Sequence, residues 1–247
     1  MSERDALEGY DLIGDVHGCG ATLATLLERL GYHQRDGVYR HPRRKVIFLG
    51  DLIDRGPRIR LAVSIARRMV EAGEALIVLG NHEVNALAYC HRAPAESDRE
   101  WLREHTPRHN RIVRETLAQY RDHPEEWEQT LAWFLDIPLC LELDGLRVVH
   151  ACWDQVLIDE LRRQRPDTCI DLDFLSEAMR PGTRASLILD RLTRGAICPC
   201  PMACVSTPAM ALRGAVSAPT SGPGSRAPGG MWSFSRTICR MNWKRAN

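Results

Sequence analysis

The chain has 247 residues, 44% hydrophobic and 26% charged, with a formal net charge of +1 at pH 7. This length and apolar content predict one domain with a buried core, and the near-neutral charge argues against a nucleic-acid partner. Apolar runs span only a few residues, so we expect no membrane partner and no membrane-spanning helix. The acidic first eight residues lack a hydrophobic signal segment, which predicts a cytoplasmic protein whose nine cysteines are free thiols.

Apolar runs that end in glycine and a polar cluster occur at three places in the first 83 residues. The runs are residues 10–13, 45–49 and 75–79, and each is followed by Gly and then by Asp, Asn or His. Short apolar runs bounded by such turn signals predict buried strands.

Two helices are expected between these strands. Leucines recur at helical spacing over residues 23–30, and a second helix is predicted to open at Pro57. The expected apolar face of the second helix consists of Leu61, Ile65, Met69 and Val70. Asp36 and Gly37 mark the turn of a small hairpin on the way to the second strand. The alternation of strands and helices predicts a parallel sheet with helical crossovers.

The middle of the chain has a different pattern. Residues 91–136 are charged and mostly helical in periodicity, and we interpret them as a helical cap beside the site. Residues 139–143 and 146–150, with Asp-Gly between them, predict a hairpin that begins a second sheet. Helical segments are expected at about 154–164 and 172–194.

The polar clusters follow the predicted strand ends, where ligands gather in parallel sheets. Three of them occupy residues 14–18, 50–57 and 80–83, and His150 follows a fourth strand. Hard oxygen ligands and imidazoles repeated at strand ends are what a two-metal phosphoester hydrolase needs.

Each cluster taken alone also has a purely structural interpretation. Asp51 and Asp54 could cap the helix that follows them, and Asn81 and Glu83 could cap the next one. His82 could be a hydrogen-bonded loop histidine. The joint occurrence of the clusters at neighbouring strand ends favours a metal site over these alternatives.

The ordered set GDVHG, GDLIDRGP, GNHE and VHAC resembles the calcineurin-like metallophosphoesterases over residues 10 to about 197. It is most similar to a bacterial branch that resembles phosphoprotein phosphatases and bis-nucleosyl tetraphosphatases. The resemblance implies an α/β fold in which two β-sheets pack between helices, as four α/β/β/α layers. It also implies two divalent metals between the strand ends, with manganese, iron or zinc as candidates.

The resemblance also assigns metal ligands. Asp15 and His17 would bind the first metal, and Asp51 would bridge both metals. Asn81 and His150 would bind the second. Two cations roughly 3.5–4 Å apart acidify a bound water and neutralise phosphoryl oxygens, and a bridging carboxylate is a natural spacer between them.

The same resemblance assigns the catalytic residues. His82 would be the general acid for the leaving group, with Asp54 orienting its imidazole. Arg55 would hold the substrate phosphate, together with Asn81, because a guanidinium offers phosphate a two-pronged hydrogen-bonding partner.

The last part of the chain differs in composition from the rest. There is no Asp or Glu after Asp190 and no histidine after His150. The family normally supplies one more histidine to the second metal from a downstream Gly-His motif, so the resemblance implies a weakened second site and an incomplete second sheet. We expect a shifted reading frame just after Ala196, a metallophosphoesterase domain at 1–197 and an atypical, disordered tail at 198–247.

Two other interpretations of the tail stay open. Its cysteines could bind zinc, although the spacing C-x-C-x3-C is not common for zinc fingers; these are Cys198, Cys200, Cys204 and Cys239. A basic tail could also touch nucleic acid, although its charge is sparse.

The predicted function is metal-dependent hydrolysis of phosphoester bonds by a metal-activated hydroxide, on a small-molecule or phosphoprotein substrate. Two alternatives stay open: a dinucleoside tetraphosphate hydrolase, and a catalytically inactive remnant that binds one metal or none. Neither the physiological substrate nor the oligomeric state follows from the sequence.

Overall fold

The three apolar runs form the central sheet. In the computed structural model, which describes residues 7–195 and 240–242, β1 (Gly9–Ile13), β4 (Arg44–Phe48) and β5 (Ala75–Ile77) pair in parallel. β8 (Arg240–Asn242) pairs antiparallel with β1, and the strand order is β5-β4-β1-β8. The predicted parallel pairing of the first three strands is confirmed.

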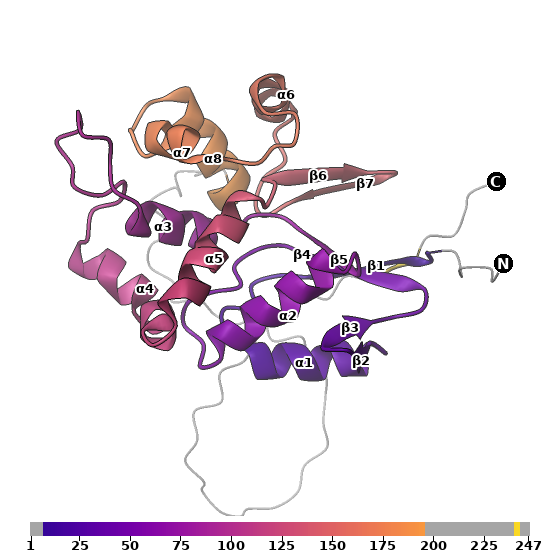
Figure 1. Cartoon of the computed structure of the whole chain (residues 1–247). Coiled ribbons are helices and arrows are strands. Elements are labelled where there is room, and N and C mark those ends of the chain that lie inside the picture. Colours follow the sequence, from indigo (N-terminus) through magenta and orange to yellow (C-terminus); the bar gives the residue numbers. More distant parts are fainter. Residues whose placement is uncertain (1–6, 196–239, 243–247) are drawn as a thin grey trace, which may run out of the picture. The chain divides into compact units, whose positions relative to one another are not determined.

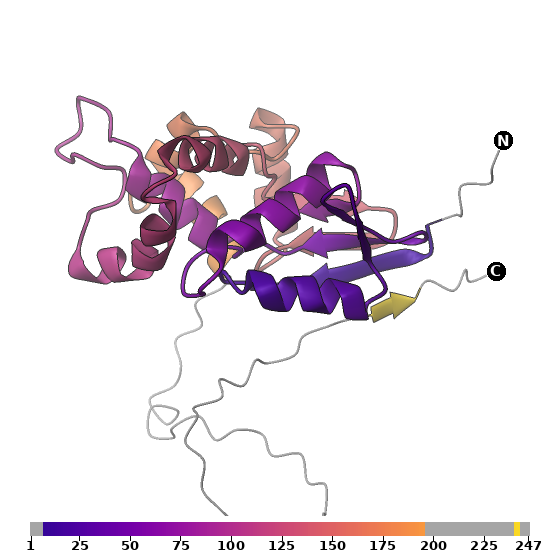
Figure 2. The same cartoon turned by 60° about the horizontal axis from the view of Figure 1, so that its bottom comes forward.

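Helices α1 (Gly20–Arg29) and α2 (Ile59–Glu71) cover one face of this sheet (Figures 1 and 2). The predicted apolar face of α2 is wrong in one position, because Leu61 is 39% exposed. The helix begins at Ile59 rather than Pro57. Leu61 lies at the edge of the apolar stripe, because successive residues of a 3.6-residue turn are about 100° apart and its neighbour Ala62 is on the buried face. The buried face consists of Ile59, Ala62, Val63, Ile65, Ala66 and Met69.

The small predicted hairpin is present between α1 and β4. It consists of β2 (His33–Arg35) and β3 (Val38–Arg40). Asp36 and Gly37 both have left-handed backbone angles, with φ of 52° and 78°. Two such residues in a row suit the tight two-residue turns that connect antiparallel strands.

A second hairpin covers the other face of the sheet (Figure 1). It is formed by β6 (Cys140–Leu143) and β7 (Leu146–Val149). Ile47, Val78 and Val148 are buried together between the sheet and this hairpin. Within the described residues, the second sheet has these two strands only.

Three helices follow the second hairpin: α6 (Gln155–Gln164), α7 (Leu172–Ala178) and α8 (Arg184–Arg194). They lie beyond the hairpin in Figure 1, so the predicted α/β/β/α order of layers is confirmed. The helical segment predicted at 172–194 is two helices, because Pro181 and Gly182 interrupt it and proline cannot continue the helical hydrogen bonding.

The predicted cap contains two helices and a loop. Helices α4 (Pro107–Tyr120) and α5 (Pro124–Leu135) lie with α3 (Asn81–Cys90) at the end of the sheet where the parallel strands terminate (Figure 1). Residues 91–106 form a loop whose Arg92 and Trp101 make an isolated β-bridge. The helical prediction is therefore confirmed for the second part of 91–136.

Several predictions for the end of the chain fall outside the described residues. They include the shifted reading frame after Ala196, the zinc-binding cysteines and, apart from β8, the disordered tail at 198–247. The division into a domain at 1–197 and a tail stays a prediction. In the part of the chain that the structure describes, no helix is long and apolar enough to cross a membrane.

A buried charge on β1 is held by two partners. Asp11 is fully buried, and its Oδ2 accepts hydrogen bonds from the Tyr32 hydroxyl at 3.0 Å and from Arg44 Nε at 2.8 Å. The Arg44 guanidinium also bonds the second oxygen of Asp11. Burial and the charge of Asp11 raise the pKa of Tyr32, so its hydroxyl keeps the proton that it donates.

Replacing Arg44 by alanine should lower the free energy of unfolding by about 3 kcal/mol, because it leaves the Asp11 carboxylate buried without its cation. Arg43→Ala is the matched control. Its partner Glu8 is about half exposed, so the loss should stay below about 1 kcal/mol. Urea unfolding of the two variants measures both values. Equal effects at the two positions would contradict the importance of the buried pair.

Candidate metal centre

The loops after β1 and β4 have an unusual backbone. Asp15, His17, Asp51, Asp54 and Arg55 have φ angles of 48°, 41°, 54°, 68° and 66°. Side chains other than glycine rarely adopt this left-handed region, and such residues concentrate at functional sites where the surrounding structure holds them. The backbone therefore turns sharply at both strand ends and directs these polar side chains to one place.

The two loops also touch each other closely. Gly18 N–H donates to Leu52 O at 2.7 Å, and His17 N–H donates to Asp51 O at 2.8 Å. A Cβ atom at Gly56 would lie 2.2 Å from His17 O. Only glycine fits at residue 56, and its absence of a side chain lets the second loop pack on the first.

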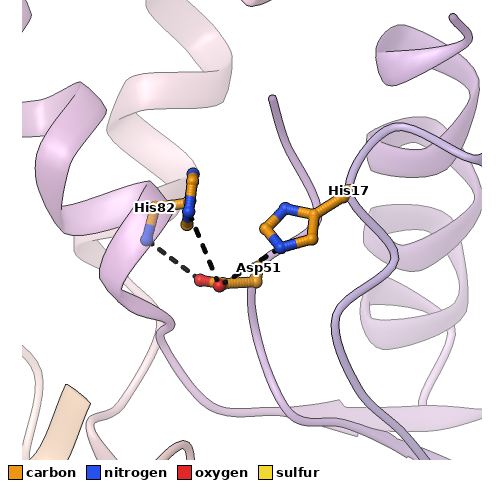
Figure 3. Close-up of side chains that lie close together, drawn as sticks. All are labelled: His17, Asp51 and His82. Atoms are coloured by element: carbon orange, nitrogen blue, oxygen red, sulfur yellow. Dashed lines mark hydrogen bonds and ion pairs between the residues drawn. The ribbon is translucent and has the colours of Figure 1, made fainter. Parts of the chain in front are cut away.

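Asp51 lies at the centre of the cluster (Figure 3). Its Oδ2 is 3.7 Å from His17 Nε2 and 3.9 Å from His82 Nε2. Its Oδ1 is 3.7 Å from His150 Nε2 and accepts the His82 backbone N–H at 2.9 Å. One carboxylate thus faces imidazoles that come from three different segments of the chain.

Ligand atoms gather in two groups around this carboxylate. His17, Asp51 and His82 form one group, and Asp15, Asp51 and His150 form the other. In each group the atoms lie within 4.8 Å of one another. The shared member is Asp51, the residue predicted to bridge two metals. The groups otherwise differ from the predicted ligand sets, because Asp15 lies with His150 and His17 lies with His82.

Two of the imidazoles are held in the tautomer that can bind a metal. Nδ1 of His17 lies 3.0 Å from Ile53 O, and Nδ1 of His150 lies 2.5 Å from Leu49 O. A carbonyl oxygen only accepts, so each Nδ1 carries the hydrogen and each Nε2 keeps its lone pair. Burial lowers the pKa of His17, which favours the neutral form that coordinates metals.

The environment of His150 fits a cation. Its Nε2, an acceptor in this tautomer, lies 3.1 Å from Asn81 Oδ1 and 3.7 Å from Asp51 Oδ1. Three acceptor atoms that face one another have no hydrogen to share, and a bound cation would satisfy all of them. The donor set of the second predicted site therefore suits a divalent metal.

His82 differs from the other two imidazoles because its Nδ1 faces a carboxylate. Nδ1 lies 2.6 Å from Asp54 Oδ2, and Asp54 is fully buried. Burial by itself lowers the pKa of His82, but the bond to Asp54 and the charge of Asp51 outweigh it and raise the pKa above its ordinary value. This arrangement is typical of a histidine that donates a proton.

Arg55 and Asn81 lie beside His82 as predicted for substrate-binding residues. Arg55 is exposed, and its Nη2 is 3.3 Å from His82 Nε2. Asn81 is the first residue of α3, four positions after Ile77, the last residue of the third parallel strand. The structure thus brings all the predicted site residues together; their roles stay predictions.

One capping interpretation is correct for Glu83 but not for Asn81, which is the first residue of α3 after its capping position Gly80, and another interpretation is wrong. Glu83 accepts the Gly80 N–H at 3.2 Å, so it does cap α3. It also accepts the Asp51 and Leu52 N–H groups, each at 2.8 Å, and therefore joins two strand ends. Burial and the charge of Asp51 raise its pKa to about 7. In contrast, neither Asp51 nor Asp54 caps α2, whose capping position is Arg58.

The cap helix α4 supplies two supporting residues that the sequence did not indicate. Thr116 donates its hydroxyl to Asp54 Oδ1 at 2.5 Å and accepts the Asp54 N–H at 3.1 Å. Gln119 accepts the Ile59 N–H at 2.7 Å and donates to Gly56 O at 2.9 Å. A polar pair at i and i+3 beside the buried Val113 and Tyr120 is the signal that could have identified them.

Replacing Thr116 by valine should reduce turnover about 10-fold, because residues that orient a reacting group typically contribute 10- to 100-fold. Thr116→Ser keeps the hydroxyl and should restore turnover. Thr130→Val is a matched control, since Thr130 is also buried and its hydroxyl donates to Glu126 O within α5 rather than to a residue of the site. Phosphatase rates of the three variants show whether the Thr116 hydroxyl supports turnover. Equal losses in Thr116→Val and Thr116→Ser would mean that the hydroxyl does not matter.

Known proteins show the following similarities. The sequence model of the family described as calcineurin-like phosphoesterase matches residues 11–194. A bis(5'-nucleosyl)-tetraphosphatase from Halalkalibacterium halodurans is 43% identical over 74 residues, which cover 30% of each chain. Another, from Oceanobacillus iheyensis, is 31% identical over 147 residues, covering 57% of this chain and 54% of that protein. The chain therefore spans about half, or less, of the length of these curated relatives.

A solved cold-active protein-tyrosine phosphatase of a psychrophilic Shewanella species also aligns with the structure. The TM-score is 0.45 and the sequence identity 17%, over 75% of this chain and 58% of that chain.

Proposed function

Since the chain belongs to the calcineurin-like phosphoesterase family, we propose that it hydrolyses phosphoester bonds with two divalent metal ions held around Asp51. The observation that carries the proposal is the place of Asp51 in both groups of ligand atoms. Two cations about 3.5–4 Å apart need a shared ligand of this kind.

Each metal would have three ligands from the described residues. Asp15, His17 and Asp51 would hold the first ion, and Asp51, Asn81 and His150 would hold the second. Bound divalent ions supply Lewis acidity, which neutralises charge on phosphate oxygens and acidifies water near neutral pH. Mixed oxygen and nitrogen ligands suit manganese, our first choice, or iron or zinc.

His82 would give the proton at Nε2 to the oxygen of the leaving group. Its Nδ1 is engaged by Asp54, which leaves Nε2 as the nitrogen that can reach a substrate. Arg55 would hold the phosphate beside that nitrogen, because its guanidinium already lies 3.3 Å away. A proton that meets the departing oxygen prevents an alkoxide from building up.

Hydrolysis of dinucleoside tetraphosphates is a second candidate function. The names of the two relatives support it, although the matched segments cover 30% and 54% of those proteins. The substrate would then be a small molecule rather than a phosphoprotein. The proposal places the enzyme in the cytoplasm, where thiols stay reduced; the described residues include the free cysteines Cys19, Cys90, Cys140, Cys152 and Cys169.

Metal reconstitution of the whole 247-residue chain tests the proposal. The metal-free protein is supplied with manganese, the metal bound per chain is counted by elemental analysis, and hydrolysis is followed on p-nitrophenyl phosphate, a phosphopeptide and diadenosine tetraphosphate. Two bound ions with manganese-stimulated turnover are expected. One ion or none, with no turnover on any substrate, would favour the inactive remnant and contradict the proposal.

A further inference from the structure

A cavity of about 730 Å³ adjoins the metal centre on the side of His82. Asn81, His82 and Arg55 form the part of its wall that belongs to the centre. Arginines from the cap and from α8 line the rest. These are Arg103, Arg108, Arg111, Arg114 and Arg194, and the only acidic residue among the described lining is Glu115.

Most of this positive charge has no partner. Arg114 pairs with the neighbouring Glu115, and Arg194 pairs with Asp190 and bonds Asn85. Within residues 7–195, neither Arg103 nor Arg108 nor Arg111 takes part in an ion pair. Three unpaired arginines that share one concave wall attract anions strongly.

Arg103 shows how crowded the charge is. Its side chain is partly buried, and burial together with the charges of Arg194 and Arg108 lowers its pKa. A guanidinium stays protonated even so, and repulsion between like charges in a low-dielectric site is relieved when an anion binds.

The position of the cavity relative to His82 indicates which end of a substrate it would receive. His82 belongs to both the metal centre and the cavity, since its Nε2 lies 3.9 Å from Asp51 Oδ2 and it lines the cavity together with the arginines. In the proposed reaction His82 protonates the leaving group. The arginines therefore lie where the leaving group would be, beyond the phosphate that is attacked.

We propose that Arg103, Arg108 and Arg111 form an anion subsite for a leaving group that itself carries a chain of phosphate groups. The inference rests on the proposed function, and it adds the chemical class of the substrate. A cavity of this volume is far larger than one phosphate needs and lies within the range of small-molecule sites. Arginine forks bind phosphate oxygens in pairs, and several such forks suit closely spaced charges.

The chemistry of the lining favours a phosphate chain over an acidic phosphopeptide. Ile112 is the only apolar side chain among the lining residues described. Peptide recognition needs pockets for side chains and backbone partners in addition to charge. In the reaction, water loses one proton to solvent, its oxygen bonds to the terminal phosphorus, and the bridging P–O bond of the phosphoanhydride breaks. The shortened phosphate chain leaves with the proton from His82, which takes a proton from solvent afterwards.

Substrate selectivity of arginine variants tests the subsite. With manganese present, Arg108→Ala/Arg111→Ala should lose about 10-fold or more in kcat/KM on inorganic tripolyphosphate and on a nucleoside tetraphosphate. Its kcat/KM on p-nitrophenyl phosphate should stay within about 2-fold, because that leaving group has no phosphate. Arg121→Ala is the control, since Arg121 directly follows α4, is exposed and lies outside the cavity lining.

The pattern of losses identifies the ligand. A loss on tripolyphosphate and on the nucleotide means that the phosphate chain alone is recognised; a loss on the nucleotide alone means that the chain is read together with its nucleoside. Equal losses on all substrates would overturn the proposal, because the arginines would then serve the attacked phosphate. A loss confined to an acidic phosphopeptide would also overturn it and favour a protein substrate.

Binding without turnover separates this proposal from the proposed function. Calorimetric titration of the metal-free protein with tripolyphosphate should show binding that weakens at least about 10-fold in Arg108→Ala/Arg111→Ala and weakens with added salt. An inactive protein that still binds tripolyphosphate in this way would contradict the hydrolytic function and keep the subsite. An active protein whose tripolyphosphate binding is unaffected by the two substitutions would keep the hydrolytic function and contradict the subsite.

Discussion

Asp51→Ala should remove both metals from the protein and reduce phosphatase turnover by at least about 100-fold, since even residues that only orient metal ligands contribute 10- to 100-fold. The carboxylate belongs to both groups of ligand atoms, so its loss takes one ligand from each ion at the same time. No other described residue is shared between the two groups. Elemental analysis of the manganese-loaded variant, beside turnover, measures both effects.

Two controls are needed to interpret a loss of metal in Asp51→Ala. Asp122→Ala, at an exposed position between α4 and α5, should bind metal as the unaltered protein does. Thermal unfolding of metal-free Asp51→Ala shows whether the variant is folded, because Asp51 also accepts the His82 backbone N–H. A folded Asp51→Ala protein that keeps two ions per chain would refute the bridging role.

His82→Ala should behave in the opposite way with respect to metal. Turnover should fall by about 100- to 10,000-fold, the usual range for loss of a general acid, while both ions stay bound. The physical reason is that Asp54, 2.6 Å from Nδ1, and the charge of Asp51 raise the pKa of His82, and a protonated imidazole has no lone pair left for a metal. Measuring metal content and turnover on the same sample tests whether turnover is lost while both ions stay bound.

The metal count is the decisive measurement for His82, because its Nε2 also lies among potential ligand atoms with His17 and Asp51. A variant that loses one ion along with its activity would make His82 a ligand instead of an acid. Substrates with good leaving groups add a second test, since p-nitrophenyl phosphate needs less acid assistance than an alkyl phosphate and should suffer less. His123→Ala, exposed at the start of α5, is the control.

Much of the central sheet and of the site could be predicted from local patterns. The apolar runs at 10–13, 45–49 and 75–79 contain most of β1, β4 and β5, although β5 already ends at Ile77, and the polar clusters follow these runs directly. Parallel strands place their carboxyl ends at one edge of a sheet, so residues remote in sequence were expected to meet there. The helix start and the width of the apolar stripe were harder to predict, as the start of α2 at Ile59 and the 39% exposed Leu61 show.

Contacts between distant segments could not be predicted. Thr116 and Gln119 reach the loop of Asp54 and Gly56 across some sixty residues of chain, and nothing in the spacing of α4 indicates that partner. The grouping of the cavity arginines could not be predicted either, for the same reason. In the sequence they look like ordinary exposed helix residues, and their shared wall exists only after the cap and α8 pack beside His82.

The amino-acid sequence by itself determined the parallel strands, the clusters at their ends and the chemistry of Asp15, His17, Asp51 and His150, since each depends on residues that are close along the chain. Only the tertiary structure decided which carboxylate stands between both groups of ligand atoms and which arginines face the general acid. Those properties depend on distances between separate segments, and packing sets such distances where sequence spacing does not.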